Sequence, residues 1–140
     1  MNNTFDPNDV GIANGNFFGF PTLEDAPMLL LGVPWDVSTS YGGGTHRGPQ
    51  AILEASPQLD FHDFTFENAW RYGHQTQMLD ALLDTNQSMR QRAKEIIDCL
   101  EAGQALDKGL QQQLDEVNSA CAQMVERVKQ ASSEALNEGQ

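Results

Sequence analysis

The sequence predicts an α/β fold, and three consecutive stretches carry that prediction. Residues 28–33 form a short apolar run, which is typical of a parallel strand covered on both faces. A glycine-rich loop follows, and Gly48-Pro49 then begins a helix, with proline in the first turn, where its missing N–H costs nothing. Such a strand–loop–helix unit places its loop at the carboxyl end of a strand, where open α/β sheets bind ligands.

Two prolines set limits on these first elements. Pro34 cannot donate to a sheet ladder, so the strand should end there. Pro57 should stop the helix that begins at about Gly48, so that the helix ends at Ala55. Residues 58–66 alternate partly between apolar and polar side chains and predict a second strand or an edge strand. A short helical turn is expected over 79–83.

The region from 86 to 138 is rich in predicted helix. Thr85 or Asn86 is the expected N-cap of a helix to Ala102, with Gly103 just beyond its end. Asp107 should cap a longer helix to about Glu138. Its apolar positions form a heptad stripe that contains Leu110, Leu114, Val117, Cys121, Met124, Val128, Ala131 and Ala135. The stripe favours packing on the chain's own sheet or antiparallel pairing with the preceding helix; a coiled-coil dimer is the alternative.

Composition excludes several classes of function. The 140 residues carry 8 Lys and Arg against 20 Asp and Glu, a net charge of −12, which argues against nucleic acid and against an anionic membrane surface. No apolar run is long enough to span a bilayer, and the first 20 residues are too polar for a signal peptide. Cys99 and Cys121 both fall in predicted helices, so we expect reduced core thiols. The composition is that of a soluble cytoplasmic protein.

Residues 1–27 are rich in Asn, Gly, Pro and Asp and predict an extended leader with turns. Phe17, Phe18 and Phe20 are apolar in this polar setting. They are expected to pin the leader onto the domain or onto a neighbouring subunit, and the alternative is that they wall a substrate pocket. His74 stands alone beside a glycine and is expected at the surface.

No catalytic or metal-binding residue follows from the spacings alone. Asp60, His62 and Asp63 are metal-capable, but on a strand only the first two would share a face, and a metal site needs more ligands. A solvated edge strand is the better interpretation. The segment 42–46 lacks the Lys-Ser/Thr of a phosphate loop, and no serine or cysteine has the neighbours that a nucleophile requires.

The glycine-rich region and its flanks contain the segments Gly32-Val33-Pro34-Trp35-Asp36, Thr39-Ser40-Tyr41, Gly44-Thr45 and Gly48-Pro49-Gln50-Ala51-Ile52. These segments resemble the N-terminal signature of the ureohydrolases, the family of arginase, agmatinase, formimidoylglutamase and guanidine hydrolase. The resemblance is closest to the agmatinase-like branch. The leader segments Phe5-Asp6-Pro7-Asn8 and Asn14-Gly15-Asn16-Phe17-Phe18-Gly19 are similar to the leader of one agmatinase-like subgroup.

This resemblance implies a three-layer α/β/α fold around a parallel sheet. It implies two manganese ions (nickel in the guanidine-hydrolysing branch) that activate water to attack the carbon of a linear amidine such as guanidine or agmatine, releasing urea. The loop would lie near the active-site mouth, which makes Tyr41, Thr45 and His46 candidates for substrate contact. The family's metal ligands come from Gly-Gly-Asp-His, Asp-Ala-His-x-Asp and Asp-x-Asp segments, and none of these occurs here.

Residues 28–140 are therefore expected to be the incomplete N-terminal part of a single ureohydrolase domain, inactive alone. The complete protein is expected to bind a small guanidino substrate and to form a homo-oligomer, a trimer or a hexamer. The alternative function is a non-catalytic helical module that dimerises through the stripe at 110–136.

Overall fold

The protein is described by a computed structural model that covers residues 5–6, 8–21, 26–60, 65–66 and 69–137. The chain divides into two compact units. The first contains residues 1–32, 49–78 and 134–140, and the second contains residues 33–48 and 79–133. Within the described ranges, no helix is both long and apolar enough to cross a membrane.

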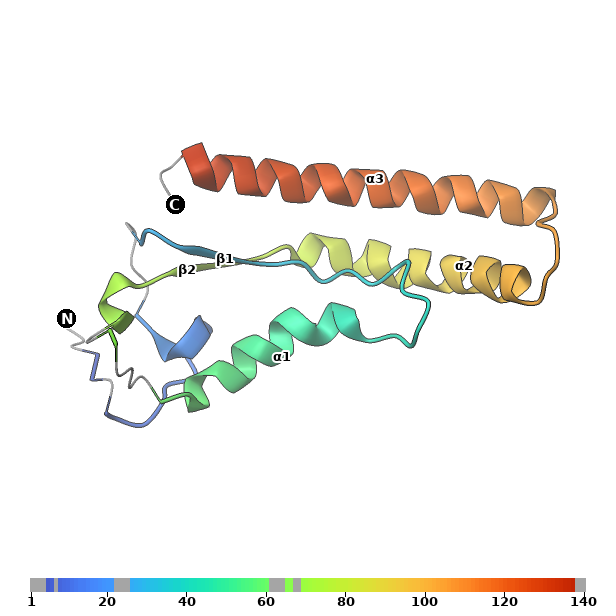
Figure 1. The fold of residues 1–140 in the computed structure, drawn as a ribbon. Helices are drawn as coiled ribbons and strands as arrows, with labels where there is room; N and C mark the ends of the chain where they lie inside the picture. Colours follow the sequence, from blue (N-terminus) through green and yellow to red (C-terminus); the bar gives the residue numbers. More distant parts are fainter. Residues whose placement is uncertain (1–4, 7, 22–25, 61–64, 67–68, 138–140) are drawn as a thin grey trace. The chain divides into compact units, whose positions relative to one another are not determined.

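A parallel pair of strands forms the sheet of the first unit (Figure 1). Strand β1 (Leu29–Gly32) lies beside β2 (Gln75–Met78), in a register that pairs Gly32 with Met78. A Cβ atom added at Gly32 would come within 2.3 Å of the Met78 sulfur, so a larger residue here would require the Met78 side chain to move. The predicted first strand and the helix α1 (Gly48–Ala55) are confirmed, although β1 is half-buried rather than covered on both faces.

The predicted second strand is wrong in position. Gln58 belongs to a short 3-10 helix, Ser56–Gln58, and the described residues 59, 60, 65 and 66 are not in a strand. Residues 61–64 lie outside the described part of the chain. The actual partner of β1 is Gln75–Met78, whose Gln-Thr-Gln-Met sequence shows no apolar alternation. This segment forms a strand because its backbone pairs with that of β1. Such a long-range contact cannot be predicted from the local sequence.

Three phenylalanines of the leader pack around a histidine in the first unit. The rings of Phe17, Phe18 and Phe20 lie 6.1, 5.4 and 5.2 Å from the imidazole of His74. The backbone N–H of Phe18 also donates to the Ser56 hydroxyl at 2.8 Å. The phenylalanines therefore hold the leader onto its own chain, as expected. The surface position predicted for His74 is wrong, because its side chain is buried and burial lowers its pKa.

The second unit is built on two helices, α2 (Leu83–Glu101) and α3 (Lys108–Asn137, of which residues up to 133 belong to this unit). They run side by side in opposite directions (Figure 1). Their core contains Val37, Ala93, Ile96 and Val117, with Met89, Leu106, Leu110, Leu114 and Cys121 packed against it. The predicted antiparallel pairing is confirmed. It packs the first four stripe positions against the chain's own core, with Val117 buried and Leu110, Leu114 and Cys121 partly buried.

The ends of these helices agree only in part with prediction. The Asp107 carboxylate accepts the N–H of Leu110 at 2.8 Å, so this residue caps α3 as expected. Gly103 follows α2 with φ of +69°, the conformation that ends helices. The predicted N-cap is wrong, because α2 begins at Leu83 and Asn86 lies buried inside it. Both cysteines are free, but Cys99 lies outside the core cluster.

Candidate functional site: the glycine-rich loop

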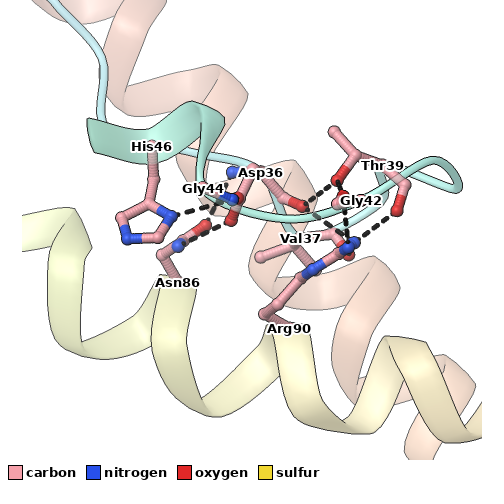
Figure 2. Close-up of polar contacts among 8 residues, drawn as sticks. All are labelled: Asp36, Val37, Thr39, Gly42, Gly44, His46, Asn86 and Arg90. Carbon is pink, nitrogen blue, oxygen red and sulfur yellow. Dashed lines mark hydrogen bonds and ion pairs between the residues drawn. The ribbon is translucent and has the colours of Figure 1, made fainter. Parts of the chain in front are cut away.

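The loop at 33–48 is organised around the buried carboxylate of Asp36 (Figure 2). One carboxylate oxygen accepts the backbone N–H of Gly44 at 2.7 Å and lies 3.0 Å from Nδ1 of His46. The other accepts the side-chain amide of Asn86 at 3.0 Å. A single side chain thus joins two points of the loop to helix α2.

Asn86 forms a second hydrogen bond with Asp36, this time as the acceptor. Its side-chain oxygen accepts the backbone N–H of Asp36 at 2.7 Å, so the two residues form a reciprocal pair. Both are 2% exposed. Buried amide and carboxylate groups are stable only when their polar atoms are paired, and each side-chain oxygen of this pair has a hydrogen-bond partner.

Arg90 holds the other side of the loop, one helical turn after Asn86 (Figure 2). Its guanidinium donates to the carbonyls of Asp36 and Val37 at 3.2 Å each, to that of Gly42 at 2.8 Å, and to that of Thr39. A planar guanidinium with several fixed N–H groups can bind several carbonyls at once, which a lysine cannot do. The loop backbone is therefore clamped along most of its length.

Gly44 is required for the loop to close. Its φ is +110°, a conformation that side chains disfavour. An added Cβ would also lie 2.8 Å from Nη2 of Arg47. The N–H of Gly44 can point at Asp36 only because the residue is glycine.

The hydrogen bonds of Asp36 fix its charge. Burial by itself raises the pKa of the carboxyl. The hydrogen bonds from His46, Asn86 and Gly44 together lower it by more, so the resulting pKa lies well below the usual aspartate range. The group is therefore ionised at neutral pH. Because an ionised carboxylate only accepts hydrogen bonds, Nδ1 of His46 must carry the proton that lies between them.

The three predicted substrate-contact residues differ from one another in exposure and in hydrogen bonding. Tyr41 is fully exposed at the loop tip, and Thr45 is exposed at the start of a 3-10 helix, Thr45–Arg47. His46 is half-buried and is the one of the three that joins the Asp36 network. Their proposed contact with substrate stays a prediction.

Sequence reasoning missed Asn86 and Arg90 and assigned no role to Asp36. A signal was present for Asn86, since it precedes Ala93 and Ile96 by seven and ten residues and so lies on the apolar face of α2. An amide on an apolar face needs a buried partner. The partner could not be read from sequence, because Asp36 lies fifty residues away.

The loop does not provide a metal site. Among the described residues, no group of three or more His, Cys, Asp or Glu side chains is placed to hold a metal ion. Asp36 and His46 supply two such groups, and they are already bonded to each other. Asp60 is exposed, while His62 and Asp63 lie outside the described ranges. We therefore assign no metal ligand here and derive no chemical step through a metal.

The fold and the loop define an α/β protein with a parallel strand pair and a clamped glycine-rich loop. The arginase-family sequence model matches residues 26–138, and the chain belongs to the arginase family. That match contains the loop, both strands and the helices α1, α2 and α3.

Curated relatives match the chain over shorter segments. The chain is 44% identical to the N(1)-aminopropylagmatine ureohydrolase of a Synechocystis species over 42 residues, which are 30% of this chain and 14% of the relative. It is 49% identical to the protein of the same name from Thermus thermophilus over 37 residues, 26% of this chain and 13% of that relative. The matched segments thus cover a small part of each relative. No solved structure matches the chain significantly.

Proposed function

We propose that this chain is the N-terminal part of a ureohydrolase, which cleaves a C–N bond of a linear amidine and releases urea. Membership of the arginase family supports the reaction class, and the ureohydrolase names of the relatives support the guanidino substrate. The observation that carries the proposal is the signature loop itself, whose signature aspartate, Asp36, is the buried centre of its hydrogen bonds.

In this proposal the loop forms the rim of the substrate pocket. Arg90 and Asp36 fix the backbone at both ends of the loop, while Tyr41 and Thr45 remain exposed. A fixed backbone that presents exposed side chains suits substrate contact, because little conformational entropy is lost on binding. Tyr41, Thr45 and His46 are the residues that would touch the guanidino group.

The family's metal pair, manganese or nickel, would supply an activated water at neutral pH. Its ligands would come from segments that these 140 residues do not contain. We therefore propose that residues 28–140 form part of one three-layer domain and that the chain alone releases no urea. The complete protein would be a cytoplasmic homo-oligomer.

An assay of urea release tests this function. The purified chain is incubated with guanidine, agmatine or N(1)-aminopropylagmatine in the presence of Mn²⁺ or Ni²⁺. The same assay is applied to the chain combined with polypeptide that carries the Gly-Gly-Asp-His and Asp-Ala-His-x-Asp segments. Metal-dependent urea release from the combination alone supports the proposal, and release by the isolated chain contradicts it. Reading the coding DNA past residue 140 for Gly-Gly-Asp-His, within about a dozen codons or one strand length, is a cheaper check.

A further inference from the structure

In the pair formed by Asp36 and His46, Nδ1 of the histidine faces the carboxylate and Nε2 faces away from it (Figure 2). We propose that Nε2 of His46 accepts a hydrogen bond from an N–H group of the guanidino ligand, and that Asp36 is the positioning residue that makes this possible. The inference rests on the proposed function, since it assigns a role within the same loop.

The geometry leaves one ring nitrogen of His46 available. Nδ1 lies 3.0 Å from the Asp36 carboxylate and, as argued above, carries the proton. In the neutral ring Nε2 is then an acceptor. The His46 side chain is 32% exposed, and no described residue forms a hydrogen bond with Nε2. Figure 2 shows this nitrogen on the side of the ring away from Asp36.

Asp36 has hydrogen-bond partners besides the histidine. Its carboxylate already accepts N–H groups from Gly44 and Asn86, and Arg90 holds the neighbouring backbone. A carboxylate behind an imidazole fixes the tautomer and the orientation of the ring. The same arrangement orients histidines that act on ligands in many proteins.

The charges near the loop indicate what kind of ligand fits. Arg90 and Arg47 border the loop and carry positive charge, while Asp36 is the only acidic residue among residues 33–48. The charged groups of the loop therefore do not by themselves favour a cation. Guanidinium can donate a directed hydrogen bond to Nε2, and tetramethylammonium cannot.

The first experiment needs no variant. Nitrogen NMR of the 140-residue chain at neutral pH measures which ring nitrogen of His46 is protonated, and a proton on Nδ1 is expected. Addition of guanidinium chloride at millimolar concentration should shift the Nε2 resonance saturably, while tetramethylammonium chloride should not. A proton on Nε2, or an equal response to the two salts, overturns the inference.

The second experiment uses His46→Asn, whose amide can still donate to Asp36 in place of Nδ1–H but offers no group at the Nε2 position. Guanidinium affinity, measured from the backbone amides of Tyr41 and Thr45, should weaken about tenfold or more, the cost of one hydrogen bond to a charged group. Ser38→Ala, an exposed change in the same loop, should bind as the wild type does.

The outcomes separate this inference from the proposed function. Amide shifts at Tyr41 and Thr45 that persist unchanged in His46→Asn overturn the role of His46 and leave the function standing. A wild-type chain that gives no response to guanidinium overturns the role as well. The urea-release assay decides on the function independently, because it requires nothing of His46.

Discussion

Replacing Asn86 with alanine is the most direct perturbation of the loop. The change removes two hydrogen bonds, the 2.7 Å bond from the Asp36 N–H and the 3.0 Å bond to its carboxylate. A neutral bond contributes about 0.5–1.5 kcal/mol and one to a charged group about 1.5–3 kcal/mol. The free energy of unfolding should therefore fall by about 2–4.5 kcal/mol, because both partners stay buried without replacement.

Urea denaturation followed by circular dichroism measures this loss as a lower midpoint, with hydrogen exchange reporting on the amides of Asp36 and Gly44. Gln87→Ala is the matched control, since Gln87 is the next residue of α2 and is exposed. Its effect should stay within about 0.5 kcal/mol. A midpoint for Asn86→Ala that equals that of the control, with unchanged protection of both amides, would refute the reasoning.

Three further predictions concern the same unit. Because the pKa of Asp36 is depressed in the folded chain, the stability that its ionised carboxylate contributes is present above about pH 5 and is lost as the pH falls below about 4. In Asp36→Asn the free energy of unfolding should therefore change less with pH across that window. An unchanged pH dependence in this variant would contradict the assignment. Arg90→Lys should lose about 1–3 kcal/mol and speed hydrogen exchange over residues 37–44, because one ammonium cannot span four carbonyls; unchanged exchange there would count against the clamp. Asp107→Ala should lower stability by about 1 kcal/mol through the lost N-cap of α3, whereas the exposed Asp115→Ala should not, and equal midpoints for the two variants would argue against capping.

Elements with strong local signals were predictable from the sequence. Four local signals each matched the structure. They are the apolar run at 28–33, Gly48-Pro49 at the start of α1, the Asp107 cap and Gly103 after α2. The heptad stripe likewise gave the face of α3 that packs on α2, because burial of one helix face follows periodicity.

Features that depend on distant partners were not predictable. Strand β2 has no apolar pattern and forms by pairing with β1. His74 is buried because three leader aromatic rings surround it. Asn86 has the residue type of an N-cap, but its amide instead pairs with Asp36, fifty residues earlier in the chain. In each case the deciding contact is made by the tertiary structure, which overrides the local preference.

Urea release tests the central claim most directly. Guanidine, agmatine and N(1)-aminopropylagmatine are offered, with Mn²⁺ or Ni²⁺, to the 140-residue chain alone and to the chain combined with polypeptide that supplies the family's metal-binding segments. The account predicts metal-dependent urea release from at least one substrate by the combination and none by the chain alone. Urea released by the chain alone, or a combination that binds metal and releases no urea from any of the three, would contradict it.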